Sequence, residues 1–118
     1  MSQEIDTPEG KIVFASEVIA TIAGLAAMEC YGVVGMAARS LQDGLAGILG
    51  RENLTRGVQV ASQDGELVIT LGIIVGYGMR ISEVAANVVE RVRYSVEQAT
   101  GLKVRRVNID VQGVKVAR

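Results

Sequence analysis

The sequence contains no histidine, no tryptophan, one cysteine, one proline and only 3% aromatic residues. Without histidine, the commonest general base, catalytic-triad partner and zinc ligand are missing. The single cysteine, Cys30, cannot form an intrachain disulfide, and its apolar neighbours predict a small core residue rather than a reactive thiol. No apolar run approaches the roughly 20 residues of a membrane-spanning helix, and the acidic start is not typical of a signal peptide. We therefore expect a cytoplasmic protein with no cofactor, no metal and no catalytic residues.

The residues that are present support one folded domain. A chain of 118 residues matches the usual size of a domain, and 49% hydrophobic residues can supply a core. The net charge is only −1, but acids gather near the N-terminus and bases near the C-terminus. The acids are Glu4, Asp6, Glu9, Glu17 and Glu29; the bases are Lys103, Arg105, Arg106, Lys115 and Arg118. The bases form either a solvated strand edge or a patch for an anionic partner, a protein or a lipid headgroup.

The first third of the chain predicts a tail, a strand, a helix and a second strand. Residues 1–9 are expected to be a flexible tail and residues 10–14 a strand. Ser16 has the chemistry of a helix cap, and Val18, Ile19, Ile22, Leu25 and Ala26 follow at helical spacing. Residues 31–36 read as an apolar strand, which places Tyr31 in the core.

The segment between residues 37 and 57 has two interpretations. Leu41, Leu45, Ile48 and Leu49 share one face of a short helix, but three glycines weaken that helix by up to ~1 kcal/mol each. This marginal helix is either a lid over the sheet or a docking helix that becomes ordered on a partner or on another copy of the chain.

The rest of the chain has the clearest signals. Residues 58–62 and 66–75 predict a hairpin closed by Asp64 and Gly65, and the second of these strands has apolar residues on both faces, as in a central strand. A long helix is expected from Ser82 to a stop at Gly101, followed by a strand over residues 107–114 with a bulge at Gly113. The predicted buried stripe of the long helix is Ile81, Val84, Ala85, Val88, Val92, Val96 and Ala99.

These elements predict an α+β fold: a two-layer α/β sandwich with a mixed sheet of about five strands, two main helices on one face and the short marginal helix. Residues 10–118 would form the single domain after the tail.

Several short motifs together resemble the alkaline shock protein family, the envelope stress response proteins of Gram-positive-type bacteria, and within it the YloU-like branch. They are Ser16–Ala20, Cys30–Met36, Glu52–Asn53, Arg56–Val58, Tyr77–Gly78, Ile81–Ala85, Thr100–Leu102, Val107–Ile109 and Val111–Val114. Many family members carry an acid just before the Tyr77–Gly78 motif, where this chain has Gly76, so a role built on that acid would not transfer.

The resemblance implies a cytoplasmic protein, in some cases held at the membrane by partner proteins, that helps to maintain the envelope under stress. It implies no catalytic activity and no cofactor. YloU-like members also resemble proteins encoded beside a fatty-acid kinase, which points to an enzyme of lipid metabolism as a partner.

Six residues are candidates for partner binding. Tyr77 lies between two glycines at a strand end and is either a turn-packing residue or a partner contact. Tyr94, which is not one of the six, either flanks the helical stripe or lies at its edge. The other five are Arg105, Arg106, Leu41, Leu45 and Ile48. The leading hypothesis is a non-catalytic scaffold or adaptor that binds protein partners and another copy of itself. The alternatives are an accessory protein of fatty-acid or phospholipid metabolism and, less favoured, a nucleic-acid-binding module.

Overall fold

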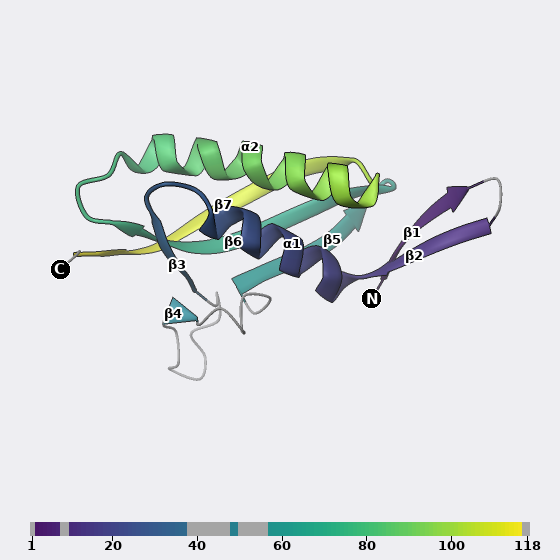
Figure 1. Ribbon diagram of the computed structural model, residues 1–118, viewed down its shortest axis with the longest axis horizontal. Helices are drawn as coiled ribbons and strands as arrows, with labels where there is room; N and C mark the ends of the chain where they lie inside the picture. Colours follow the sequence, from purple (N-terminus) through teal and green to yellow (C-terminus); the bar gives the residue numbers. More distant parts are fainter. Residues whose placement is uncertain (1, 8–9, 38–47, 50–56, 117–118) are drawn as a thin grey trace.

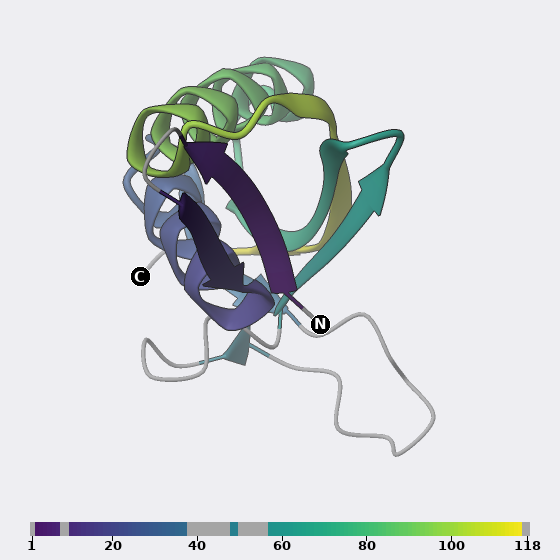
Figure 2. The same cartoon turned by 90° about the vertical axis from the view of Figure 1, so that its right-hand side faces the viewer.

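The computed structural model describes residues 2–7, 10–37, 48–49 and 57–116, and Figure 1 shows two helices on one face of a sheet. The elements are β1 (Ser2–Thr7), β2 (Gly10–Ala15), α1 (Ser16–Met28), β3 (Val33–Ala37), β4 (Ile48–Leu49), β5 (Val58–Gln63), β6 (Glu66–Gly76), α2 (Ile81–Thr100) and β7 (Val104–Lys115). Figure 2 looks along the helices and separates the two layers, with the buried core between them. The predicted α+β sandwich is confirmed.

The strands from β3 to β7 form a mixed sheet in which β6 is central. β7 runs parallel to β6 from Leu67 to Gly76, while β5 and β3 pair antiparallel with successive parts of β6. Since β7 occupies one edge of β6, β3 and β5 share the other. Four of these strands are substantial, and the two-residue β4 extends the sheet beyond β3.

The close approach of β3 and β5 along one edge leaves no room for a side chain at Gly72. A Cβ built at this position would overlap the carbonyl oxygen of Ala37, the last residue of β3. Backbone cannot yield as the end of a flexible side chain can, so glycine is needed at Gly72 for steric rather than conformational reasons.

The β5–β6 hairpin forms as predicted. Val58 pairs with Leu71 and Gln63 with Glu66, which leaves Asp64 and Gly65 as the two loop residues. Both have positive φ, 53° and 80°, as the twist-matched two-residue turn requires. A local sequence signal was sufficient here because the turn chemistry alone fixes the register.

The crossover from β6 through α2 to β7 builds most of the core. α2 buries one residue per turn, Val84, Val88, Val92, Val96 and Thr100. The prediction was wrong at the two ends of this stripe: Ile81 is 42% exposed and Ala99 is exposed, because the sheet lies under the middle of the helix and the stripe drifts to Thr100.

The ends of α2 differ in detail from the prediction. The helix begins at Ile81 rather than Ser82, with Arg80 as its cap residue. Gly101 takes the predicted left-handed conformation, φ 79°, and its N–H donates to the carbonyl of Glu97. The Leu102 N–H donates to the Thr100 hydroxyl instead of to a helix carbonyl, so the helix ends in the simpler left-handed motif with one backbone hydrogen bond.

The last strand is longer than predicted and has two bulges. β7 begins at Val104, and its register against β6 shifts once at Arg105 and again at Gln112, next to the predicted bulge at Gly113. Val104 and Val107 are buried on the helix side, but Val111 is 38% exposed, since the edge strand is only partly covered there.

α1 packs beside α2 on the same face of the sheet. Ala15 is its cap residue and makes no side-chain capping bond, so the predicted cap at Ser16 was wrong. The Ser16 hydroxyl lies inside the first turn, buried, with no hydrogen-bond partner among the described residues. Ile19 and Ala26 are in the core as expected, whereas Val18 and Leu25 are 47% and 44% exposed.

The N-terminal region and the predicted marginal helix gave the largest differences. In place of a tail over residues 1–9, β1 pairs antiparallel with β2 in a separate two-stranded sheet, which extends beyond the N-terminal end of α1 in Figure 1. The strand at residues 10–14 is therefore not part of the main sheet. Ile48 and Leu49, predicted to be helical, form β4 on the edge of β3, because their extended backbone pairs with Met36 and Ala37.

Candidate functional site

A groove runs along the outward face of α2, where this helix meets the turn between α1 and β3. Its first part is a hollow of about 420 Å³ lined by Glu29, Cys30, Tyr31, Asn87, Glu90, Arg91 and Tyr94. Its second part, about 290 Å³, shares Tyr31 and Asn87 and adds Gly78, Met79, Arg80, Glu83 and Val84. We call the two parts together the α2 groove. Its total size is within the range of sites that bind ligands or partner side chains.

The wall opposite α2 is a tight turn fixed by Gly32. The Gly32 φ of 96° is in the left-handed region, and a Cβ there would lie 2.7 Å from a methyl group of Val84 on α2. The Gly32 carbonyl also accepts a hydrogen bond from the Gly76 N–H at 2.9 Å. The turn is thus held against both α2 and the end of β6, and it places the preceding Tyr31 at the rim of the groove.

All three tyrosines of the chain are largely exposed. Tyr31 is 83% exposed, Tyr77 72% and Tyr94 65%. The prediction that Tyr31 lies in the core was wrong, because β3 begins only at Val33 and Tyr31 belongs to the turn before it. Tyr94 lies at the outer edge of α2, one of the two alternatives left open by the sequence.

Two ion pairs cross or border the groove. Arg91 on α2 donates to Glu29 on the α1–β3 turn at 2.6 Å, and Arg80 donates to Glu83 at 2.8 Å. Both pairs are largely solvated, so they orient side chains more than they stabilise the fold. Glu90, which also lines the groove, has no ion pair within the part of the chain that the structure describes.

The thiol of Cys30 lies at the inner side of the groove. Burial raises its pKa; the nearby Arg91 acts in the opposite direction, and Glu29 adds a smaller increase. The S–H donates to the Ala26 carbonyl at 3.6 Å. Cys30 is partly buried and packs against the core, and a raised pKa is the reverse of what an activated nucleophile requires.

The candidate residues predicted from the sequence do not come together. Tyr77 follows the end of β6 beside the second part of the groove, and its N–H bonds to the carbonyl of Lys115. Arg105 lies near the start of β7, at the opposite end of the β6–β7 pair. At roughly 3.3 Å per residue, about ten strand residues separate the two ends by some 30 Å.

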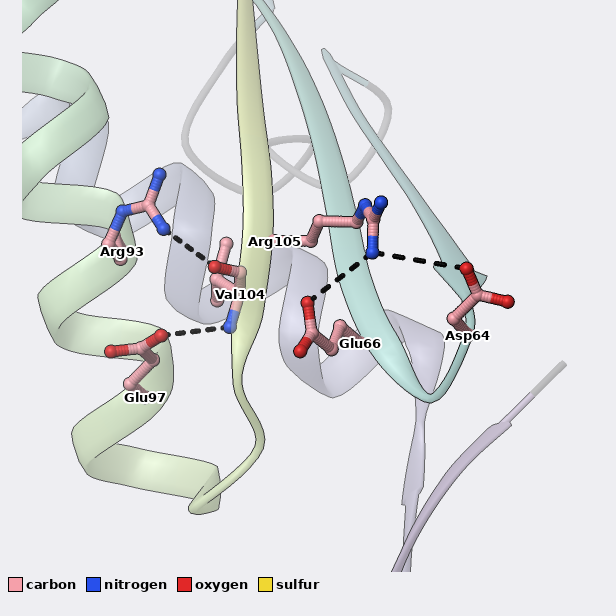
Figure 3. Close-up of polar contacts among 6 residues, drawn as sticks. All are labelled: Asp64, Glu66, Arg93, Glu97, Val104 and Arg105. Atoms are coloured by element: carbon pink, nitrogen blue, oxygen red, sulfur yellow. Dashed lines mark hydrogen bonds and ion pairs between the residues drawn. The ribbon is translucent and has the colours of Figure 1, made fainter.

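The two arginines of β7 also have different environments. Figure 3 shows Arg105 directed away from α2 toward Asp64 and Glu66, at 3.9 and 3.8 Å. Arg106 is exposed and pairs in register with Val68, one strand position from the buried Leu67. Arg93 and Glu97 reach from α2 to the backbone of Val104, which fixes the start of β7 to the helix.

The three remaining candidates belong to the segment predicted as a marginal helix. Leu41 and Leu45 lie outside the described residues, and Ile48 is in β4. Their role as a docking surface stays a prediction.

Only part of the groove can be recognised from the sequence. Asn87, Glu90, Arg91 and Tyr94 recur three and four residues apart on one helix face, a spacing visible in the sequence. Glu29 and Tyr31 meet that face only through tertiary contacts, since Glu29 and Arg91 are 62 positions apart. No local signal predicts such a meeting.

Neither α1 nor α2 is both long and apolar enough to cross a membrane. Across the described ranges, histidine, cysteine, aspartate and glutamate side chains do not gather into a group of three that could hold a metal ion.

The family comparison and the similar sequences agree with one another. The sequence profile of the alkaline shock protein 23 family, described as having a cell envelope-related function, matches residues 4–116. The chain is 52% identical to the uncharacterized protein YloU of Bacillus subtilis strain 168 over 98% of both chains. It is 40% identical to the uncharacterized protein Spy1614 of Streptococcus pyogenes serotype M6, over 98% of this chain and 97% of that one. It is 36% identical to the uncharacterized protein YqhY of B. subtilis strain 168, over 93% of this chain and 81% of the relative.

Proposed function

The chain belongs to the alkaline shock protein 23 family, whose function is cell envelope-related, and from this premise we propose that it is a non-catalytic adaptor that binds a protein partner through the α2 groove. The resemblance that the sequence motifs indicated, including the likeness to YloU, is confirmed by these comparisons. In this proposal the adaptor acts at the cytoplasmic side of the membrane and reaches it through the partner.

The observation that carries the proposal is the exposure of two tyrosines across one groove. Folding gains little from a tyrosine that remains 83% exposed, as Tyr31 does, or 65% exposed, as Tyr94 does. Tyrosine is among the residue types enriched at the energetic centres of protein interfaces, and both rings line the same hollow. A partner that covers these residues would gain the burial that the fold leaves unused.

The chemistry of the groove supports binding rather than catalysis. The chain has no histidine to serve as a base, and the thiol in the groove has a raised pKa. Each arginine of the groove is already paired with a carboxylate of the same groove.

Site-specific photocrosslinking in a host that encodes the chain tests the proposal. A benzophenone amino acid is placed at position 31, at position 94, or at the control position Gln98, which is exposed on α2 but does not line the groove. We expect the same partner protein to be captured from positions 31 and 94, in the membrane fraction, and not from Gln98. Equal capture from all three positions, or none from any, would contradict the adaptor role of the groove.

A further inference from the structure

We propose that the partner segment held by the α2 groove is basic, and that it places an arginine or lysine side chain between Tyr31 and Tyr94 beside the carboxylate of Glu90. This proposal rests on the proposed function and names the chemistry of the partner.

Charge is the first argument. Three acids (Glu29, Glu83, Glu90) and two bases (Arg80, Arg91) line the groove, which leaves a net charge of −1. The two bases are matched by Glu83 and Glu29 at 2.8 and 2.6 Å. The carboxylate left over is Glu90, which has no ion pair in the described part of the chain. An incoming cation would therefore pair with the carboxylate of Glu90, whereas an anion would have to displace a carboxylate from an existing ion pair.

The aromatic rim is the second argument, and it does not depend on the count of acids and bases. A guanidinium or ammonium group stacked on a tyrosine face is attracted by the ring, most strongly where water is partly excluded. Tyr31 and Tyr94 both border the same 420 Å³ hollow as Glu90. On α2, Tyr94 follows Glu90 by one helical turn, so ring and carboxylate lie on one face. The aliphatic stem of a lysine or arginine would also cover part of the exposed rings.

A basic partner is consistent with an envelope-related role. Segments of membrane proteins that flank a spanning helix on the cytoplasmic side are rich in lysine and arginine. The basic strand of a second copy is the alternative occupant, since its Arg106 is exposed even though its Arg105 is held near Asp64 and Glu66, and a self-association measurement distinguishes it.

The test uses fluorescence anisotropy of a labelled peptide in which arginine and lysine alternate with leucine, and a matched peptide with glutamate at the basic positions. Glu90→Gln should weaken binding of the basic peptide about three- to tenfold. Arg91→Gln should strengthen it about two- to fivefold, since it frees the carboxylate of Glu29. Tyr31→Ala and Tyr94→Ala should each weaken it, and the glutamate peptide should bind poorly to every form.

Two control variants separate position from total charge. Asp64→Asn removes one negative charge at the β5–β6 turn, where asparagine tolerates the positive φ, and Arg106→Gln removes one positive charge from the exposed start of β7. Both should change binding less than twofold. Amide chemical shifts in a two-dimensional NMR spectrum should move at Asn87, Tyr94 and Tyr31 when the basic peptide is added.

Three results would overturn the proposal. The first is tighter binding of the glutamate peptide than of the basic peptide, and the second is an equal effect of Glu90→Gln and Asp64→Asn on binding of the basic peptide. The third is a self-association in analytical ultracentrifugation that Glu90→Gln abolishes, which would make the occupant a second copy. Failure of the peptide test with retained crosslinks at positions 31 and 94 would leave the adaptor role intact with a different partner chemistry. Failure of the peptide test together with loss of the crosslinks at positions 31 and 94 would contradict the proposed function as well.

Discussion

The two faces of α2 differ in almost every chemical respect. The inward face repeats valine at Val84, Val88, Val92 and Val96, each 3% exposed or less. The outward face carries an amide, a carboxylate, a guanidinium and a phenol at Asn87, Glu90, Arg91 and Tyr94. A uniform apolar row can only be packed, while a varied polar row bordering a hollow can recognise a partner. The helix thus divides stability and recognition between its two sides, and substitutions can test whether that division is complete.

The largest effect is expected within the sheet, where Gly72 of β6 lies against the end of β3. Gly72→Ala would force Ala37 and the end of β3 to move, so we expect a loss of about 3 kcal/mol or more in the free energy of unfolding. Urea denaturation followed by circular dichroism measures it. Gly113→Ala is the control, because a Cβ there would lie at an ordinary 3.5 Å from Ile74. Similar losses in both variants would contradict the steric explanation.

The next effect concerns the valine row itself. Val92 is fully buried, and Val92→Ala removes two methyl groups from the middle of the core. We expect a loss of about 2–3 kcal/mol in stability with binding of the groove's partner unchanged under folding conditions. Reduced peptide affinity in this variant, measured at a temperature where it is fully folded, would show that the two faces are coupled.

A smaller effect is expected where α2 is tied to β7. Glu97 accepts the Val104 N–H at 2.8 Å, and Arg93 donates to the Val104 carbonyl at 2.6 Å. Glu97→Ala leaves this partly buried N–H without its partner and should cost about 1–2 kcal/mol. Glu90→Ala, the same change of charge on the outward face, should cost less than about 0.5 kcal/mol in thermal or urea unfolding.

Cys30 lies at the boundary between the two faces, and the reactivity of its thiol reports whether its surroundings are buried or exposed. Because burial raises its pKa in the folded chain, iodoacetamide should modify Cys30 several-fold more slowly than in the urea-unfolded chain at neutral and mildly alkaline pH. The same shift stabilises the fold below the thiol's unfolded pKa, and that contribution is lost as the pH rises through the folded pKa.

The pH dependence has a direct control. Stability measured against pH should fall more steeply for the natural chain than for Cys30→Ala at alkaline pH. Faster alkylation in the folded chain would place Cys30 on the outward, reactive side.

The smallest effect on stability is expected for the outward face. Tyr94→Ala removes a ring that is 65% exposed, so its cost should be below about 0.5 kcal/mol despite the size of the side chain. A cost comparable to that of Val92→Ala would mean that the tyrosine serves the fold, and the case for a recognition surface would weaken accordingly.

Local chemistry accounts for the parts of the fold that the sequence predicted correctly. The Asp64–Gly65 turn, the left-handed Gly101 and the central character of β6 each follow from residues within one element or its ends. The errors arose where neighbours distant in sequence decide the outcome. The cap at Ser16, the exposure of Ile81 and the strand at Ile48 depend on where the sheet lies and which strand edge is available.

The candidate site residues likewise include some that local sequence predicted correctly and some whose environment only the tertiary structure decided. Tyr77 was correctly expected at a strand end, and it is exposed. Arg105 and Arg106 were grouped because they are adjacent in sequence, but the bulge at Arg105 and its pairing with Asp64 and Glu66 separate their environments. A strand bulge depends on the register of both strands, which a single strand's sequence does not specify.

By itself the sequence determined the family, the α+β class, the valine row of α2 and the turns that close its elements, because periodicity and turn chemistry act over a few residues. Only the tertiary structure decided which side chains share a surface. It brought Glu29 and Tyr31, at the end of α1, to Arg91 and Tyr94 on α2, and it required glycine at Gly72 beside Ala37. Contacts between residues this far apart in the chain arise from packing the helices on the sheet, and no local pattern encodes them.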